Sequence, residues 1–403
     1  MSLIDLLKSQ SAWENYHDYK VLKGNISSAE EKDLFDFISD KEYIDAVDRI
    51  VSGSILLPER KFIGKSGSSK KRAVFIFPRE ENFVFKLLTY LLMREYDGIF
   101  CDNLYSFRVN NGVRNAVHSI LKIPGLNAKY AYKADISDYF NSIDVNLLLP
   151  ELKEILLDEP EVFSIFEIIL LNDKCLENGQ IITAKKGVMA GAPFSVFLAN
   201  IFLSSLDYKM KESGFTYARY SDDIIVFADD YESVLSASTI IKEFISGRGL
   251  KINRDKEQFT LPCEEWSFLG FKYHNGKVDV SEVAKKKLKA KIRRRARSIK
   301  RWQIRKDASP ERAMRAFIKA VNRKLYYSTD VNDLNWSRWY FPIINTDESL
   351  REIDAYIQYW ARFLITGKHI KSNYNVTYFD LKEAGLITLV NSWYKFRKNG
   401  PDS

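Results

Sequence analysis

The spacing of hydrophobic residues predicts a mixture of helices and short strands along the chain. Apolar residues recur at helical spacing in residues 1–60 and 81–96, and Ser27 or Ser28 can cap a helix in the first region. Between these regions, residues 61–72 are rich in glycine, serine and basic side chains and lead into a strand-like segment. This stretch predicts a mobile cationic hairpin.

The centre of the chain changes between strand-like and helical patterns in an order typical of an α+β fold. Ser221 and Asp222 separate two strand-like runs and suit a two-residue hairpin turn. In this α+β arrangement, separate elements would converge on one metal site. The predicted elements are a strand over 130–134, a glycine-rich turn with an apolar helix over 195–206, strands over 217–220 and 224–227, a helix over 231–250 and a strand over 251–260.

Two adjacent carboxylates, Asp222 and Asp223, stand at the tip of the predicted hairpin. Such a pair repels itself unless something positive, most simply a divalent cation, neutralises it. Aspartate is also common in solvated turns, so a third carboxylate is needed before a metal site is predicted. Asp135 supplies it, because it directly follows its own strand, whereas Asp138 and Asp144 do not.

Basic residues are concentrated in residues 284–306, which hold 13 lysines and arginines and no acidic residue. The whole chain carries a formal charge of +8, so the rest of it is net negative. The pattern predicts an amphipathic helix whose cationic face binds nucleic acid, with an anionic membrane surface or plain solvent as alternatives. Its apolar stripe comprises Leu288, Ile292, Ala296, Ile299 and Trp302.

Length and composition narrow the possibilities further. A chain of 403 residues that is 46% hydrophobic can bury a large core in two or three subdomains. No apolar run of about 18 residues occurs, and the N-terminus lacks a signal-peptide pattern, so we expect a cytoplasmic protein with no membrane partner. Cys101, Cys175 and Cys263 are far apart, which indicates neither zinc nor a disulfide framework.

Seven motifs between residues 61 and 273 occur in the order of one enzyme family. They are RAVFIFP, YSFR, ADISDYFNSI, GAP with its helix, YSDD, GLKINRDK and FLGF. On these motifs the chain resembles reverse transcriptases, closest in style to bacterial retron, abortive-infection and defence-associated enzymes. The resemblance implies a right-hand polymerase of the α+β class, with fingers, a palm built on an antiparallel sheet and a helical thumb. The implied parts are a helical N-terminal region over 1–60, fingers over 61–130, palm with interleaved fingers elements over 131–262, a primer-grip hairpin over 263–283, and a basic helical thumb with C-terminal helices over 284–403.

The resemblance also assigns chemical roles to the carboxylates. Asp135 and Asp222 would hold two Mg²⁺ ions, with Mn²⁺ as an alternative, and Asp223 would contribute more weakly. The backbone carbonyl of Ile136 would complete the metal on the nucleotide side, and Lys256 would protonate the leaving pyrophosphate.

Further residues of the resemblance would contact the nucleotide and the primer. Lys71 and Arg72 would clasp the triphosphate, and Phe140 would select dNTPs by excluding a 2′-hydroxyl, a role compatible with core packing. The chain departs from the family before Gly191, because Ala190 stands where a glutamine is common, which leaves room for repetitive or weakly templated synthesis. The implied primer grip is Phe268, Leu269 and Gly270, with packing as the alternative.

The leading functional prediction is an RNA-directed DNA polymerase that makes DNA from dNTPs on a dedicated structured non-coding RNA, in antiphage defence. Template-independent or protein-primed synthesis is an alternative, motivated by Ala190 and the 22 tyrosines. A non-catalytic RNA-binding scaffold is another. The C-terminal aromatic blocks suit either RNA stacking or a core, and the oligomeric state is not predicted. The residues predicted to bind nucleic acid are Arg108, Lys287, Lys291, Arg294, Arg297 and Arg301.

Overall fold

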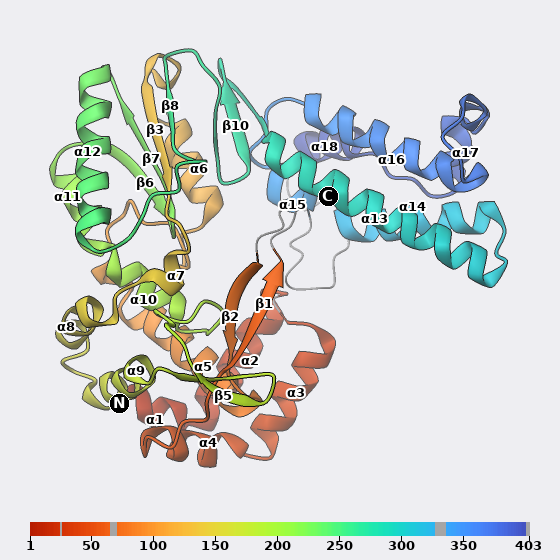
Figure 1. Ribbon diagram of the computed structural model, residues 1–403. Coiled ribbons are helices and arrows are strands. Elements are labelled where there is room, and N and C mark those ends of the chain that lie inside the picture. The colour runs from red at the N-terminus through yellow and green to blue at the C-terminus, as the bar shows by residue number, and fades with distance from the viewer. Residues whose placement is uncertain (25, 65–70, 327–335, 400–403) are drawn as a thin grey trace. The chain divides into compact units, whose positions relative to one another are not determined.

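The chain forms two compact units, Met1–Glu264 and Glu265–Ser403 (Figure 1). Most of the predicted primer-grip hairpin over 263–283 therefore belongs to the same unit as the C-terminal helices. The structure is a computed structural model, which describes residues 1–24, 26–64, 71–326 and 336–399.

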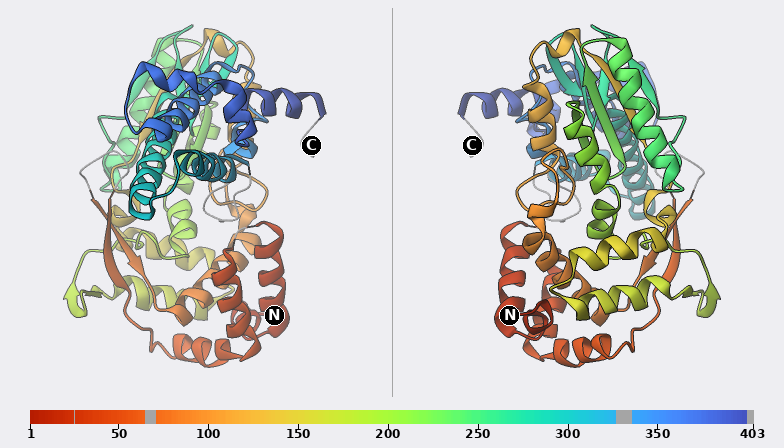
Figure 2. Two further views of the ribbon diagram at one scale, coloured as in Figure 1. Left: turned by 90° about the vertical axis from the view of Figure 1, so that its right-hand side faces the viewer. Right: turned by 90° about the vertical axis from the view of Figure 1, so that its left-hand side faces the viewer.

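The N-terminal region is helical, as the hydrophobic pattern predicted, and its helices pack together with the helix that follows the predicted hairpin (Figure 2). Trp13 fills the centre of this packing, with its ring 5.3 Å from that of Phe37 and 5.5 Å from that of Tyr43. Of the two predicted caps, Ser27 accepts a hydrogen bond from the N–H of Glu30. The helices are α1 (Leu3–Leu7), α2 (Gln10–Leu22), α3 (Ser28–Ser39), α4 (Glu42–Val51) and α5 (Arg79–Glu95).

A four-stranded sheet contains the predicted cationic hairpin. Its strand order is β2-β1-β4-β5, with β1 and β2 antiparallel and β1 parallel to β4. The pairing of β1 with β2 confirms the hairpin, while its tip over 65–70 lies outside the described residues. The strands are β1 (Glu59–Gly64), β2 (Lys71–Ile76), β4 (Lys174–Glu177) and β5 (Gln180–Thr183).

A second four-stranded sheet, entirely antiparallel, has the order β6-β7-β3-β8. Its centre is apolar, because Ile224, Ile225 and Val226 of β7 are fully buried. Helix α12 packs against β3 and β7. The elements are β3 (Tyr130–Asp135), β6 (Thr216–Tyr220), β7 (Asp223–Ala228), β8 (Gln258–Thr260) and α12 (Tyr231–Gly247).

Two predicted elements differ from the structure in this unit. The strand predicted over 251–260 is formed only by β8, because residues 254–256 make a turn in which the N–H of Lys256 donates to the carbonyl of Asn253. The apolar helix predicted over 195–206 is divided at Leu203 into two helices. The remaining elements of the unit are η1 (Asp97–Ile99), α6 (Val113–Leu121), η2 (Leu126–Ala128), α7 (Tyr139–Ser142), α8 (Val145–Ile155), α9 (Pro160–Leu171), α10 (Ser195–Phe202) and α11 (Ser204–Glu212).

The second unit begins with a three-stranded antiparallel sheet of order β11-β10-β9. Leu269 and Gly270 join its first two strands with positive φ angles, and Asn275 and Gly276 do the same for the next two. Two-residue turns of this kind match the twist of antiparallel strands. The strands are β9 (Trp266–Phe268), β10 (Phe271–His274) and β11 (Lys277–Val280).

Helices α13, α14 and α16 pack against one another in the rest of this unit (Figure 1). The predicted basic helix is α13, and its stripe is buried through Ile299, whereas Trp302 is only half-buried. The last part of the predicted C-terminal helices, over residues 378–399, forms two helices. No helix among the described residues combines the length and apolar character needed to cross a bilayer. The helices are α13 (Glu282–Lys306), α14 (Pro310–Tyr326), α15 (Trp336–Tyr340), α16 (Glu348–Thr366), η3 (Lys371–Asn375), α17 (Tyr378–Glu383) and α18 (Leu389–Asn399).

Candidate active site

The three predicted carboxylates meet at one end of the β6-β7-β3-β8 sheet. Asp135 ends β3 and lies directly opposite Asp223, the first residue of β7. Asp222 precedes it in the turn, and the carbonyl of Asp222 accepts the N–H of Ile136 at 3.3 Å. Residues that pair directly across antiparallel strands point to the same face, so Asp135 and Asp223 share one surface of the sheet.

Electrostatics confirm that these carboxylates affect one another. The pKa of Asp222 is raised to about 6, chiefly by burial and in addition by the neighbouring carboxylates of Asp223 and Asp135. Lys256 partly neutralises the group, with its Nζ 2.5 Å from Oδ1 of Asp135. Burial alone would lower the pKa of Lys256, yet the hydrogen bond and the negative charge of the three carboxylates raise it overall.

The donor set fits a hard divalent cation. Three carboxylates supply only oxygen ligands and negative charge, which is the combination that Mg²⁺ prefers. Within the described parts of the chain, no three His, Cys, Asp or Glu side chains are already arranged around a common point. Asp135 is instead engaged by Lys256 and by Nδ2 of Asn253, which lies 3.2 Å from its Oδ2. Asn253 had no role predicted from the sequence, although it lies in the GLKINRDK motif.

The glycine-rich turn is pressed against the segment that carries Phe140. Gly187 has a φ of +52°, and a Cβ there would lie 2.3 Å from the carbonyl oxygen of Phe140. The same carbonyl accepts the N–H of Val188 at 2.9 Å. Phe140 itself is half-buried on α7, so its ring has both packing and an accessible part. Glycine is required at residue 187 because no side chain fits there.

Ala190 and Gly191 lie against β2. The N–H of Ala190 donates to Oδ1 of Asn141 at 3.1 Å, and its carbonyl accepts the N–H of Phe75 at 2.8 Å. A Cβ at Gly191, whose φ is +103°, would lie 3.1 Å from the carbonyl oxygen of Phe75. The turn is therefore joined to the strand that carries Lys71, an exposed residue. Arg72, next to it, is exposed as well.

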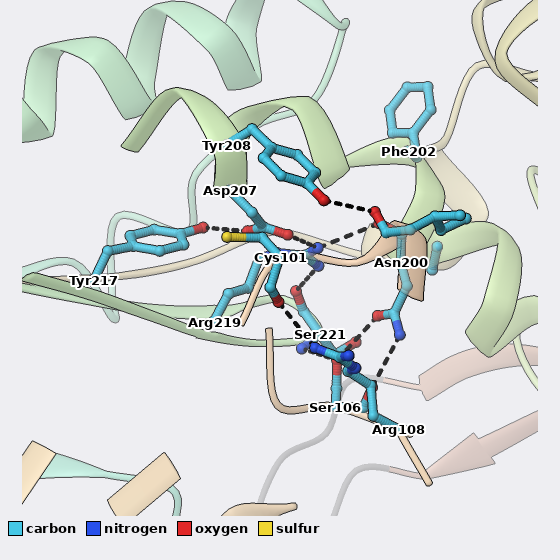
Figure 3. Close-up of polar contacts among 12 residues, drawn as sticks. Cys101, Ser106, Arg108, Asn200, Phe202, Asp207, Tyr208, Tyr217, Arg219 and Ser221 are labelled. Carbon is cyan, nitrogen blue, oxygen red and sulfur yellow. Dashed lines mark hydrogen bonds and ion pairs between the residues drawn. The ribbon is translucent and has the colours of Figure 1, made fainter. Parts of the chain in front are cut away.

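A buried ion pair lies beneath the hairpin turn (Figure 3). Arg219 of β6 and Asp207 of α11 are both 0% exposed. Nε of Arg219 lies 2.7 Å from Oδ1 of Asp207, and its Nη2 lies 2.5 Å from Oδ2. The hydroxyl of Tyr217 also donates to Oδ1 of Asp207, at 2.9 Å. Two opposite charges so buried require each other, because neither has water to solvate it.

Two hydrogen bonds hold Ser221 of the hairpin turn, one from the ion pair and one to Ser106. Nη1 of Arg219 donates to the carbonyl of Ser221 at 3.2 Å, and the N–H of Ser221 donates to Oγ of Ser106 at 2.9 Å. Ser106 in turn donates to Oδ1 of Asn200. Ser221 has a φ of +60°, so the residue before Asp222 is held in a conformation that serine rarely adopts. Ser221 was predicted as a turn residue, but no role was predicted from the sequence for Arg219, Ser106 or Asn200.

Arg108 is a correction to the predicted nucleic-acid contacts. Its side chain is only 8% exposed. Its Nε and Nη2 lie 2.9 and 2.8 Å from the two carboxylate oxygens of Asp97, and it also donates to the carbonyls of Cys101 and Asp97. A guanidinium with these partners supports the loop around it, and most of its donors are already used within the protein.

The predicted primer-grip residues lie in the turn between β9 and β10. Phe268 is buried, with 1% exposure, and Leu269 and Gly270 form the turn itself. A Cβ at Gly270 would lie 3.0 Å from the hydroxyl oxygen of Tyr340. Packing within the C-terminal unit therefore accounts for Phe268 and Gly270, and contact with a primer stays a prediction.

Helix α13 presents the predicted phosphate-binding side chains on its surface. Other cations of the helix have acidic partners, since Lys285 and Lys289 both pair with Glu352 of α16. We call the five predicted residues the exposed α13 cations. They are Lys287, Lys291, Arg294, Arg297 and Arg301.

Comparison with known proteins identifies the family of the chain. Residues 67–273 match the family described as reverse transcriptase (RNA-dependent DNA polymerase). The retron Ec86 reverse transcriptase of Escherichia coli is 27% identical over 174 residues, which are 42% of this chain and 50% of that protein. The retron Mx65 reverse transcriptase of Myxococcus xanthus is 26% identical over 140 residues, or 33% and 31% of the two chains. The chain thus spans half or less of the curated relatives it matches.

Solved telomerase structures are also similar, at low identity. Telomerase from Candida tropicalis in complex with a fragment of telomeric RNA gives a TM-score of 0.47 at 12% identity, over 84% of this chain and 58% of that one. A truncated apo form from the same organism gives 0.45 at 14% identity, over 56% and 55%.

The family match covers the segment in which the predicted motifs were found. It includes the β6-β7-β3-β8 sheet, which lies in the predicted palm, and most of the β2-β1-β4-β5 sheet, which we compare with the predicted fingers. The predicted α+β polymerase fold is confirmed. With half of its length matched and the three carboxylates of the palm in place, the chain belongs to the reverse transcriptase family.

Proposed function

We propose that this protein is an RNA-directed DNA polymerase that adds deoxynucleotides to a DNA 3′ end opposite an RNA template. The observation that carries the proposal is the meeting of Asp135, Asp222 and Asp223 at one end of the palm sheet, inside the matched segment. In phosphoryl transfer a protein chiefly positions the reactants and stabilises charge, and metal-binding carboxylates serve both purposes.

Reverse transcriptases as a family depend on divalent metal ions. We assign two Mg²⁺ ions, with Mn²⁺ as an alternative, to Asp135 and Asp222, assisted by Asp223 and the carbonyl of Ile136. Such ions, when bound, stabilise charge on the attacking and leaving oxygens. Lys256 must then leave Asp135, and its side chain, 55% exposed, is free to turn toward the leaving pyrophosphate and donate a proton.

The nucleotide would be held by the fingers and the palm together. Lys71 and Arg72 are exposed cations on β2 and suit a triphosphate. The turn at Ala190 and Gly191, hydrogen-bonded to the same strand, would form the adjacent surface of the nucleotide site. Phe140, half-buried beside the glycine turn, would contact the sugar and exclude a 2′-hydroxyl.

The partner would be a dedicated structured non-coding RNA. The exposed α13 cations support nucleic-acid binding, because a phosphate backbone is the partner that gains most from so many positive charges on one surface. The likeness to retron enzymes supports a dedicated RNA and a role in antiphage defence. The primer grip at Phe268, Leu269 and Gly270 belongs to the same proposal.

One observation favours template-independent or protein-primed synthesis as a second candidate. Ala190 is buried and its backbone groups are engaged by Asn141 and Phe75, so it offers no amide to a nucleotide. Weaker control over the template would follow. Exposed tyrosines such as Tyr374, 68% exposed, would offer a priming hydroxyl.

The experiment that tests these proposals is primer extension by the purified full chain. An RNA of mixed sequence with an annealed DNA primer is supplied with dNTPs and Mg²⁺, and the products are sequenced. DNA complementary to the RNA supports the main proposal. Untemplated DNA, or DNA covalently attached to the protein, supports the second candidate. RNA binding without any DNA synthesis would contradict both and leave a non-catalytic scaffold.

A further inference from the structure

The cations of α13 differ in whether they have acidic partners. Toward the N-terminal end of the helix, Lys285 and Lys289 both pair with Glu352, and Lys285 also pairs with Glu282 at 2.7 Å. Their charge is therefore largely neutralised within the protein. The positive charge available to a ligand lies farther along the helix.

A hollow of about 660 Å³ lies beside the C-terminal half of α13, at its boundary with α14. We name it the α13–α14 hollow. Its lining holds no acidic side chain, and its guanidinium groups belong to exposed residues. The main lining residues are Arg295, Ser298, Arg301, Trp302 and Arg305 of α13 and Ala316 of α14.

Trp302 adds an aromatic ring to the basic lining of this hollow. Its side chain is half-buried, and it lines the hollow instead of completing the buried stripe. The guanidinium of Arg312 on α14 lies 5.7 Å from the centre of its ring. An indole beside several guanidinium groups suits a ligand that has both a planar aromatic part and a phosphate. The aromatic part can stack on the indole, and the phosphate can accept charge-assisted hydrogen bonds from the guanidinium groups.

We propose that the α13–α14 hollow binds one unpaired nucleotide of RNA, with the base against Trp302 and the phosphate held by Arg295, Arg301 and Arg305. The volume is that of a small-molecule site, which suits one nucleotide and not a duplex. The proposal rests on the proposed function in one respect, since it takes RNA as the partner of this protein.

The stacking requirement distinguishes this site from phosphate contacts along α13. In a duplex the faces of the bases are covered by their neighbours, so only an unpaired base can lie against an indole. Phosphate contacts, in contrast, form with single and double strands alike. Trp302 therefore selects for unpaired RNA, and the arginines contribute affinity for either form.

The test compares Trp302→Ala and Trp302→Phe with the wild-type full chain. Affinity is measured for a short unstructured oligoribonucleotide and for a duplex RNA of the same length. We expect Trp302→Ala to weaken single-strand binding by roughly 5- to 100-fold, with Trp302→Phe between it and wild type. Duplex affinity and the salt dependence of both should not change, because stacking releases no counterions.

Phe379→Ala is the matched control, since Phe379 is an aromatic residue of the same unit, 74% exposed, outside the hollow. It should leave single-strand affinity unchanged. Replacing Arg301 and Arg305 with glutamine should weaken both RNAs and lower the salt slope by about 1.4 to 1.8 units. Thermal denaturation confirms that each variant is folded.

A free mononucleotide is the other source of the same chemistry. If uridine monophosphate competes with the oligoribonucleotide in wild type but not in Trp302→Ala, the hollow takes free nucleotides as well; if it does not compete, the hollow is confined to RNA. Unchanged single-strand affinity in folded Trp302→Ala would overturn the proposal. Failure of the proposed polymerase function is seen separately, as absent primer extension by wild type, which leaves this binding result intact.

Discussion

Variants of the buried ion pair beneath the hairpin turn should show whether the pair stabilises the fold, positions the turn for catalysis, or does both. The perturbation is Asp207→Asn, which keeps the shape of the side chain and removes its charge. Arg219 would then stay fully buried without a counter-charge, although its bonds to the carbonyls of Ser221 and Asn200 would remain. The turn that carries Asp222 depends on the first of these bonds.

The magnitude follows from the burial of both partners. Arg219 and Asp207 are each 0% exposed and are joined by two hydrogen bonds of 2.7 and 2.5 Å. Removing one member of such a pair destabilises a protein by about 3–5 kcal/mol, since the other is left as an uncompensated buried charge. We expect a loss of this size in Asp207→Asn.

The assay combines chemical denaturation, followed by circular dichroism, with the rate of primer extension. A second variant, Asp207→Leu with Arg219→Met, replaces the pair with apolar side chains and should recover much of the stability. It should extend the primer more slowly than wild type, because Arg219→Met removes the hydrogen bond that the guanidinium donates to the carbonyl of Ser221. Asp102→Asn is the matched control, since Asp102 pairs with Lys211 on the surface at 3.3 Å and should have no measurable effect on unfolding.

Two results would refute this account of the ion pair. If Asp207→Asn unfolds at the same denaturant concentration as wild type, the charges do not depend on each other. If the doubly apolar variant regains both stability and full extension rate, the pair serves packing alone and does not position the turn.

Two further predictions concern the site, and a third concerns helix α13. Phe140→Ala should increase incorporation of rNTPs relative to dNTPs, because the steric block to a 2′-hydroxyl is removed; an unchanged ratio in a folded variant would make Phe140 a packing residue only. Gly187→Ala should lower thermal stability and dNTP incorporation more than Gly179→Ala. Both glycines have positive φ, but only at Gly187 would the new Cβ meet a backbone carbonyl, at 2.3 Å. Equal effects of the two substitutions would show that this close approach does not matter. Replacing all the exposed α13 cations with glutamine should reduce the slope of log affinity for RNA against log salt by about 3.5 to 4.5 units, with helix content checked by circular dichroism; a constant slope would assign this face to another partner.

Local patterns explain why much of the palm was predictable. The run from Ile224 to Phe227 is a buried strand, and the turn before it places two acids where a strand that ends in Asp135 can meet them. The spacing of apolar residues and the residue types of a turn depend on neighbouring positions, so they can be recognised in the sequence. The apolar stripe of α13 was predictable for the same reason, through Ile299.

The supporting residues depend on tertiary contacts that no local pattern records. Arg219 lies in a strand, where an arginine usually faces solvent, and only the fold brings it to Asp207 of α11. Arg108 was predicted to bind nucleic acid because no local pattern links it to its partner, Asp97, which lies 11 residues earlier in the chain. Trp302 had the spacing of a packed residue, yet the path of α14 leaves it beside a hollow.

The most direct test of the central claim is the primer-extension rate of Asp222→Asn compared with that of Asp229→Asn. Both aspartates flank β7, but Asp222 belongs to the carboxylate site, whereas Asp229 lies at the other end of the strand, 84% exposed, and pairs with Lys129. Loss of an outer-sphere partner of a metal ligand typically lowers activity 10- to 100-fold, so loss of a ligand should exceed about 100-fold. We predict this loss in Asp222→Asn, a wild-type rate in Asp229→Asn and matching thermal denaturation of both. An Asp222→Asn protein that extends the primer within a few-fold of wild type would contradict the account.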